Sequence, residues 1–228
     1  MKNINDILFI VQARVNSERA PQKMIRPFAG TNLFDIALKK IKQTKIPLEN
    51  FRASIYEQEL IDICKENGLQ YYKRSKESAN NDTSLQKIYE WHNQFDYKYA
   101  VIINACNLFL QPETIDAFID EYVSNAYDGQ FAVMPKKQYY WNQSGSLITN
   151  WPTGNNIMNT KAVETIYEAG HVLYAGQMEK IKQGVWMGRP PYGKNNPHLF
   201  EISEFECLDI DYEWQFDLYT NYWEKLNG

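Results

Sequence analysis

A short apolar run near the start of the chain, followed at once by a cation-rich loop, limits the possible folds more than any other feature. Residues Ile7 to Val11 are five consecutive apolar side chains between polar ones. This pattern is typical of a strand buried on both faces of a parallel sheet. The next residues include Arg14, Arg19 and Lys23, and Pro21 disfavours helical geometry just before it. Taken alone, these charges also fit a solvated basic loop. The order strand, Arg, Ser, Arg, Pro, Lys instead predicts a polyanion-binding loop at the carboxyl edge of a parallel sheet.

Alternating strand and helix patterns follow this loop. Apolar periodicity predicts strands at residues 51–56, 69–72 and 99–103, and helices at residues 33–45, 58–67, 85–92 and 112–123. From Phe131 the pattern changes to short strands with turns. The alternation indicates a doubly wound fold of class α/β, with three α/β/α layers and a mixed, mainly parallel sheet. A length of 228 residues is that of one domain, spanning 1–228.

Composition excludes several classes of protein. A net charge of -4 argues against broad nucleic-acid binding. The three cysteines, Cys64, Cys106 and Cys207, are far apart, which is typical of free thiols in a reducing compartment. The apolar run at the start is too short for a signal peptide or a membrane span, so we expect a cytoplasmic protein with no membrane partner. The three histidines, with His171 expected at a helix end and His198 in a loop, are too scattered for a metal site.

Two carboxylates near the end of the chain form the second strong signal. Asp209 and Asp211 flank Ile210, and on a strand residues two apart face the same way. Mg²⁺ takes one or two carboxylates and fills its other positions with phosphate oxygens and water. Alone, such a pair also fits polar residues at a strand end. With the cationic loop, it predicts a magnesium-nucleotide site.

The two ends of the chain together resemble the CMP-sugar synthetases, the family that includes the acylneuraminate and Kdo cytidylyltransferases. The first anchor is Gln12-Ala13-Arg14-x-x-Ser17-x-Arg19-x-Pro21-x-Lys23, and the second is the closing Asp209-Ile210-Asp211 with Asp217 after it. The resemblance implies a nucleotidyltransferase fold. It further implies that Ala13, Arg14, Ser17 and Lys23 bind CTP, that Arg19 supports the loop or the nucleotide, and that Asp209 and Asp211 hold Mg²⁺. Arg14, Lys23 and Asp211 are the implied catalytic residues.

The loop departs from the family pattern at three positions. The two glycines usual after the first Arg are Val15 and Asn16 here, and the usual Asn after the Lys is Met24. Asn tolerates a left-handed backbone, whereas a β-branched residue does not. Val15 is therefore the larger departure.

The middle of the chain matches the family less closely. Arg74 and Ser84 are similar to the residues that contact the cytosine, although they also fit a surface Arg and a helix cap. Asn104, in Asn104-Ala105-Cys106-Asn107-Leu108-Phe109, replaces a Gln of the family that contacts base or sugar, and it equally fits a turn residue ending the strand. Ser54 to Glu57 stands where relatives have a Ser-Thr-Asp turn.

An aromatic-rich segment interrupts the α/β pattern. Residues 136–161 include Tyr139, Tyr140 and Trp141 with a turn at Gly145, which predicts a β-ribbon arm. These rings either pack on the core of their own chain or, as the resemblance implies, form a dimerisation arm that helps close the sugar site of a homodimer. Asn159 is the implied sugar contact.

The sequence thus supports one functional hypothesis over two others. It is transfer of CMP from CTP to an acidic 2-keto sugar (acylneuraminate-like), with release of pyrophosphate, for lipopolysaccharide or capsule biosynthesis. One alternative is a catalytically idle relative that binds a nucleotide. The other is a GT-A glycosyltransferase, which usually carries its Asp-x-Asp mid-chain, where this sequence reads Asn104-Ala105-Cys106.

Overall fold

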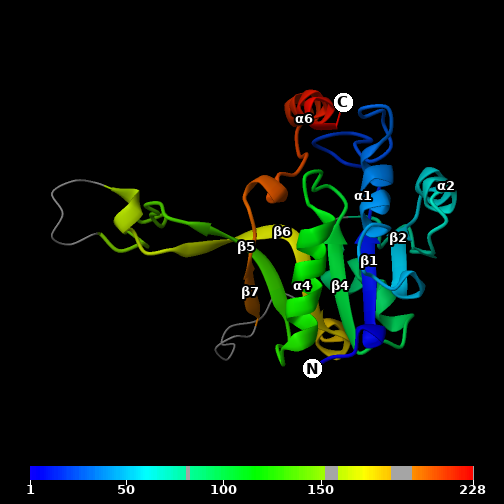
Figure 1. Cartoon of the computed structure of the whole chain (residues 1–228), viewed down its shortest axis with the longest axis horizontal. Helices are drawn as coiled ribbons and strands as arrows, with labels where there is room; N and C mark the ends of the chain where they lie inside the picture. Colours follow the sequence, from blue (N-terminus) through cyan, green and yellow to red (C-terminus); the bar gives the residue numbers. More distant parts are fainter. Residues whose placement is uncertain (81–82, 152–158, 186–196, 228) are drawn as a thin grey trace.

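The computed structural model describes residues 1–80, 83–151, 159–185 and 197–227. Within these residues, seven strands form one sheet in the order β3-β2-β1-β4-β6-β5-β7 (Figure 1). The strands are β1 (Ile7–Gln12), β2 (Phe51–Ile55), β3 (Tyr71–Lys73), β4 (Tyr99–Asn104), β5 (Gln130–Lys136), β6 (Ile166–Gln177) and β7 (His198–Glu201). The pairs that β6 makes with β4 and β5 are antiparallel, and the other neighbouring pairs are parallel. The predicted mixed, mainly parallel sheet is confirmed.

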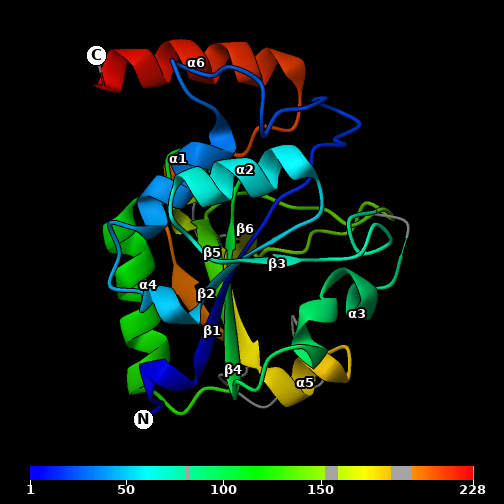
Figure 2. The same cartoon turned by 90° about the vertical axis from the view of Figure 1, so that its right-hand side faces the viewer.

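Helices cover both faces of the sheet, because the central strands are apolar on both sides. The helices are α1 (Leu33–Ile41), α2 (Gln58–Glu66), α3 (Leu85–Ile88), α4 (Pro112–Ser124), α5 (Met178–Lys182) and α6 (Glu213–Asn227). Short 3-10 turns are η1 (Ile4–Asp6), η2 (Leu48–Asn50), η3 (Glu90–Asn93), η4 (Thr160–Ala162) and η5 (Phe205–Cys207). Phe9 of β1 packs in the core with α1, α2 and α4, whereas Leu8 and Ile10 pack with Trp91 and α5. Figure 2 shows α1 and α4 on one side of the sheet and α3 and α5 on the other, which confirms the three-layer α/β/α architecture.

Several expected elements differ in extent. α1 ends at Ile41, before residue 45, and the Thr44 side chain donates to the Ile41 carbonyl oxygen at 2.7 Å. The helix predicted over 85–92 is one α-turn followed by η3, because Tyr89 leaves helical geometry. β6, twelve residues long, was not predicted. His171 lies inside it rather than at a helix end, and His198 begins β7 rather than lying in a loop.

The predicted arm leaves the body of the sheet where β5 and β6 continue outward (Figure 1). Pro135 pairs with Tyr167 at the base of the arm, and a single antiparallel bridge joins Trp141 to Leu147. Gly145 has a φ of 82°, as its predicted turn position requires. Residues 152–158 of the expected arm lie outside the described residues.

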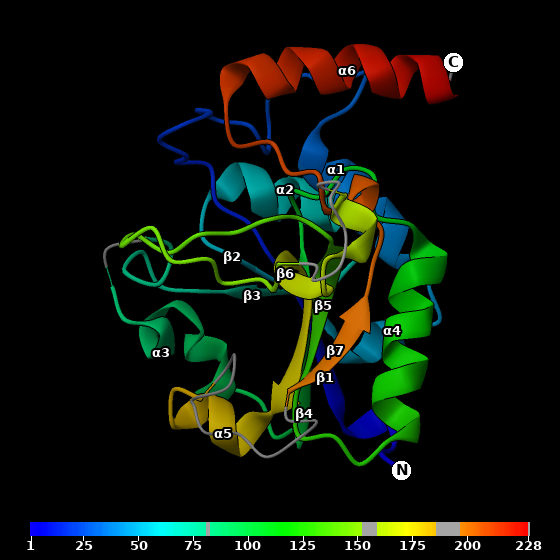
Figure 3. The ribbon, with the colours of Figure 1, turned by 90° about the vertical axis from the view of Figure 1, so that its left-hand side faces the viewer.

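The C-terminal helix closes the end of the molecule at which β1 and β4 end. Figures 2 and 3 both show α6 lying across this end, opposite the N-terminus. Phe216 of α6 packs edge-on against Phe28, with 5.3 Å between the ring centroids. Tyr219 packs against Phe109, with 5.6 Å between the ring centroids. In the described part of the chain, no helix has the length and apolar character needed to cross a membrane.

Candidate nucleotide-binding site

A cavity of about 310 Å³ lies beyond the carboxyl ends of β1 and β4, the point at which the order of the strands reverses. The strand order runs from β1 to β2 and β3 on one side and to β4 on the other, and α/β proteins bind ligands outside the carboxyl ends of strands at such a point. The cavity is lined by Gln12, Ala13, Arg14, Ser17, Glu18, Arg19, Lys23, Met24, Arg74, Ser78, Ala79, Ile88, Cys106 and Asp211. A second hollow of about 880 Å³ shares Arg14, Ser17, Glu18 and Ala79 with it.

Cations from the loop after β1 reach across the cavity to the C-terminal carboxylates. Lys23 is buried, and its Nζ donates to the Ile210 carbonyl oxygen. The same Nζ lies 3.5 Å from Asp209 Oδ1 and 3.8 Å from Asp211 Oδ1. Burial alone would lower the pKa of Lys23, but Cys106 and the two carboxylates outweigh it, so the pKa is raised and Lys23 stays charged.

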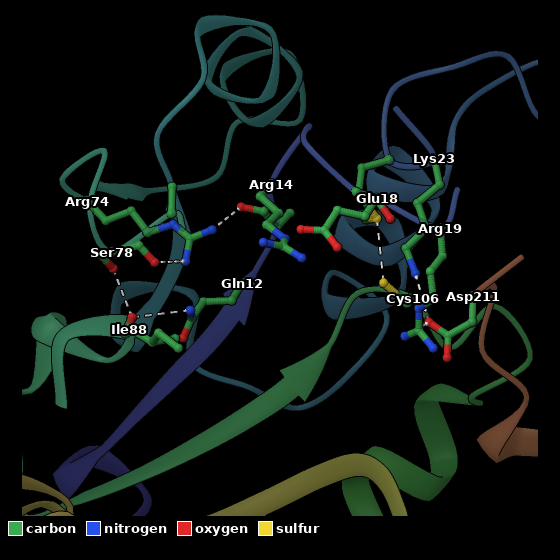
Figure 4. Close-up of a pocket in the computed structure, with 14 residues that line it drawn as sticks. Gln12, Arg14, Glu18, Arg19, Lys23, Arg74, Ser78, Ile88, Cys106 and Asp211 are labelled. Atoms are coloured by element: carbon green, nitrogen blue, oxygen red, sulfur yellow. Dashed lines mark hydrogen bonds and ion pairs between the residues drawn. The ribbon is translucent and has the colours of Figure 1, made fainter. Parts of the chain in front are cut away.

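Arg19 makes the second contact between the loop and the carboxylates. Its Nη2 lies 2.7 Å from Asp211 Oδ1, and its side chain is largely exposed. Figure 4 shows this pair on one side of the cavity, Arg74 and Ser78 on the other, and the Arg14 side chain between them. Arg14 therefore projects into the open space, and no carboxylate of the described residues forms an ion pair with it.

The loop does not use a left-handed backbone at the positions where relatives have glycine. Neither Val15 nor Asn16 has a positive φ, while Gln22 has a φ of 57°. Val15 is buried, and its backbone N–H donates to Glu57 Oε1 at 3.1 Å. The larger expected departure is thus accommodated by a carboxylate from the turn after β2.

Asp209 and Asp211 meet as predicted, although not on a strand. Asp209 forms an isolated antiparallel bridge with Asn107, and the chain around it is extended but lies outside the sheet. The prediction of a strand was wrong because the backbone partner is the loop after β4 rather than another strand. Gln215 fixes the far end of the segment, since its Oε1 accepts from the N–H groups of Asp211 and Tyr212 at 2.7 and 2.9 Å.

The carboxylate pair has the chemistry that a divalent cation requires. Burial raises the pKa of Asp209, and the charge of Lys23 opposes this rise. Such a carboxylate gains from a positive charge beside it. No group of three or more His, Cys, Asp or Glu side chains in the described ranges could hold a metal by itself. Two carboxylates facing an anion-binding loop nevertheless fit Mg²⁺, which takes its remaining ligands from phosphate and water.

The comparisons with known proteins agree with this arrangement. Residues 8–201, most of the chain, match the cytidylyltransferase family. The chain belongs to the cytidylyltransferase family. It is 30% identical over 134 residues to the spore coat polysaccharide biosynthesis protein SpsF of Bacillus subtilis (strain 168), a match that covers 55% of this chain and about half, 53%, of that relative's length. The resemblance to CMP-sugar synthetases is confirmed at the level of the family.

Two solved structures show the same fold. A CMP:2-keto-3-deoxy-manno-octonic acid synthetase in complex with CTP has a TM-score of 0.67 with 9% identity, covering 96% of this chain and 99% of that one. The 4-diphosphocytidyl-2C-methyl-D-erythritol synthase of Anaerococcus prevotii has a TM-score of 0.64 with 10% identity, covering 97% and 98%. Asp209 and Asp211 follow the matched segment of the family, so their place in the cytidylyltransferase site rests on the structure of this chain.

Arg74 is at the cavity but is held by the backbone. It is buried, and its guanidinium donates to the carbonyl oxygens of Ala13 at 2.7 Å and Ser78 at 3.2 Å. Burial lowers its pKa to about 10. Its Nε is buried without a hydrogen-bond partner among the described residues. Arg74 therefore joins the loop after β1 to the loop after β3, and its Nε–H remains a buried donor without a partner in the described part of the chain.

Four of the predicted site residues do not line the cavity. One of them, Asp209, still lies 3.5 Å from the lining residue Lys23, and the other three lie elsewhere. The Ser84 hydroxyl accepts from the Lys87 N–H and caps α3. Asn104 ends β4, where its amide donates to the His171 carbonyl oxygen at 2.8 Å and accepts from the Cys106 N–H at 2.9 Å. Asn159 caps η4 in the arm and is exposed. For Ser84 and Asn104, these are the cap and turn roles that local sequence also suggested.

Sequence reasoning missed other lining residues of this cytidylyltransferase, among them Ser78 and Cys106, and it also missed the backbone conformation of His171, which does not line the cavity. Ser78 is buried and donates to the Ile88 carbonyl oxygen at 2.9 Å, and Cys106 lies beside Lys23. His171 has a φ of 51° inside β6 and pairs through Nδ1 with Tyr174 Oη at 3.0 Å, next to the end of β4. Of these three residues, Cys106 alone carried a local signal, because it lies three residues after a predicted strand.

Proposed function

We propose that the protein transfers CMP from CTP to an acidic 2-keto sugar and releases pyrophosphate, for the biosynthesis of a surface glycan. The observation that carries the proposal is that Arg14, Arg19, Lys23 and Asp211 line one cavity, with Asp209 3.5 Å from Lys23 Nζ. Cations and a metal-binding carboxylate pair together match a magnesium-bound triphosphate. A volume of about 310 Å³ lies at the lower end of the ~300–1,000 Å³ typical of small-molecule sites.

The relatives support the two substrates at different levels. The solved synthetase of a 2-keto-3-deoxy sugar acid was crystallised with CTP, and SpsF is named for polysaccharide biosynthesis. The erythritol-derivative synthase has the same fold, so the fold alone does not select the acceptor. The relatives therefore support CTP as the nucleotide more directly than they support an acidic 2-keto sugar as the acceptor.

The mechanism assigns each charged group a task. A sugar hydroxyl attacks the α-phosphorus of CTP and releases its proton to solvent water. The bond from that phosphorus to the bridging oxygen breaks, and pyrophosphate leaves with the bond electrons. Arg14 and Lys23 hold the β- and γ-phosphates and stabilise the charge that develops on them. Asp209 and Asp211 would hold Mg²⁺, which would supply positive charge against that of the triphosphate and the leaving group. Ala13 and Ser17 line the nucleotide, with Arg74 behind the loop.

Binding of CTP requires an exchange of ion-pair partners. In the structure, Arg19 and Lys23 are paired with Asp211 and Asp209. In the proposed complex, the phosphates replace the carboxylates as partners of these cations, and the two carboxylates would then be free to hold the divalent cation.

Pyrophosphate release tests the proposal. Purified protein is assayed with Mg²⁺, each of the four nucleoside triphosphates and a panel of 2-keto sugar acids. We expect release with CTP and one sugar acid, reduced on the order of 10³-fold or more in Asp211→Asn. Glu224→Gln, at an exposed carboxylate on α6 outside the anchor motif, is the matched control and should keep wild-type activity.

Other outcomes would favour the alternatives. Stabilisation by CTP with no turnover on any acceptor would indicate a catalytically idle nucleotide-binding relative. Use of a sugar nucleotide as donor, with no release of pyrophosphate, would indicate a glycosyltransferase. No response to any nucleotide would contradict the proposal.

A further inference from the structure

The loop after β4 connects the cavity to the carboxylate segment. Cys106 of this loop lines the cavity, and Asn107, the next residue, forms the backbone bridge with Asp209. Asn107 is buried, and its Nδ2 donates to the Cys207 carbonyl oxygen at 3.0 Å. Asn107 thus contacts the backbone of Cys207 and of Asp209, on either side of Leu208. These contacts fix the position of the Asp209 backbone and therefore of its side chain.

Lys40 of α1 binds the backbone of this loop. Its Nζ donates to the Asn107 carbonyl oxygen at 2.8 Å and to the Leu108 carbonyl oxygen. Among the described residues it makes no ion pair, and Glu206 is the carboxylate whose charge acts on it. Burial lowers the pKa of Lys40 to about 7. Burying an amine in this way is costly unless its donors are used, and here they are used on two consecutive carbonyls of one loop.

The carboxylate segment needs such support because it lacks the support of a sheet. A ligand on a sheet strand is held by backbone hydrogen bonds along its length, whereas Asp209 has a single bridge to Asn107. Residues that orient a metal ligand from behind typically alter metal affinity or activity by 10–100-fold when they are replaced.

We infer that Lys40 is a positioning residue, which holds Asn107 and through it sets Asp209 in place for the divalent cation of the reaction. This inference rests on the proposed function. Lys40 touches neither substrate nor cation, so its effect passes through the loop after β4.

The test compares Lys40→Met with Lys42→Met. Lys42 is the residue directly after α1. On the exposed surface, it donates to one backbone carbonyl, that of Asn67, at 3.2 Å. In Lys40→Met we expect kcat to fall about 10-fold and the Mg²⁺ concentration for half-maximal rate to rise about 10-fold, with KM for CTP unchanged at saturating Mg²⁺. Lys42→Met should match wild type in all three quantities.

Hydrogen exchange gives a readout that needs no turnover. Backbone amides of residues 207–211 should exchange at least tenfold faster in Lys40→Met than in wild type or Lys42→Met. This result with no activity on any sugar would support the positioning role while the proposed function fails. Turnover by wild type with unchanged exchange and unchanged Mg²⁺ dependence in folded Lys40→Met would overturn the inference and leave the proposed function standing.

Asn107→Ala keeps the test decisive if Lys40→Met does not fold. Because Asn107 is the intermediate of the same connection, Asn107→Ala should raise the half-maximal Mg²⁺ concentration by a similar factor. Where both single variants fold, the double variant should show less than the product of the two effects. Wild-type Mg²⁺ dependence in Asn107→Ala, or fully multiplicative effects in the double variant, would overturn the inference.

Discussion

At the scale of single residues, the two cations that face the carboxylates differ in burial, and so in what they contribute. Lys23 is buried between Ile210 and Asp209, whereas Arg19 is mostly exposed. Removing one partner of a buried pair leaves a charge without compensation, while an exposed pair contributes little. Lys23→Met should therefore lower the free energy of unfolding by roughly 1–3 kcal/mol, and Arg19→Ala should leave it unchanged. Urea denaturation of the two variants measures this, and equal midpoints would contradict it.

Lys40 predicts a pH dependence of stability. Its pKa is about 7 in the folded protein, against an ordinary value of 10.5. Between these values the unfolded chain binds more protons, so the free energy of unfolding rises with pH. Relative to Lys40→Met, the wild type should gain on the order of 1–2 kcal/mol between pH 7 and pH 9, and nothing below pH 6. Denaturant titrations of both proteins across this range measure the difference, and a constant difference would show that Lys40 titrates normally.

At the scale of elements, β6 and the turn η5 pack too closely to admit a larger residue at Gly170. A Cβ added there would lie 2.9 Å from Cys207 Sγ and 3.1 Å from the Ala132 carbonyl oxygen. The next residue, His171, already has a positive φ, so β6 has little freedom to move away. Cys207, the nearer partner in this contact, lies two residues before Asp209.

Gly170→Ala should therefore destabilise the protein by roughly 1–3 kcal/mol, the usual cost of overpacking. Adding Cys207→Ala removes the nearer clash and should recover part of the loss, whereas Cys207→Ala alone should not stabilise. Thermal unfolding of the three variants gives the comparison. An unchanged melting temperature in Gly170→Ala would show that β6 relaxes freely.

At the scale of the whole molecule, two exposed apolar surfaces are candidates for the interface of the homodimer that the family resemblance implies. The arm exposes Trp141, Ile148 and Trp151. The C-terminal helix exposes Trp214, Leu218 and Leu226. Exposed apolar patches of this kind mark interaction sites, and the resemblance to CMP-sugar synthetases favours the arm.

We expect Trp141→Glu to halve the mass in solution and Leu218→Glu to leave it unchanged. A charge at the centre of an apolar interface is desolvated without a partner, whereas the same charge on an exposed helix is not. Sedimentation equilibrium of the two variants and wild type makes the measurement. Dissociation only in Leu218→Glu would place the interface on α6.

The sequence by itself determined the elements whose signals are local. The apolar runs of β1 and β4 and the Pro at the start of α4 predicted their elements, because burial on both faces and helix initiation depend on neighbouring residues. The two anchor motifs also predicted the family, and the structure brings Lys23 and Asp209 within 3.5 Å.

Tertiary structure decided what depends on partners distant in the chain. Asp209 lies on a bridge to Asn107 rather than on a strand, and Lys40 holds that bridge from 67 positions away. Ser78 lines the cavity in place of Ser84, because the loop after β3 folds back on Arg74. None of these contacts leaves a periodic or compositional pattern. Hydrogen bonds between distant segments are selected by the packed backbone, whereas the sequence pattern reports only which side chains are buried from water.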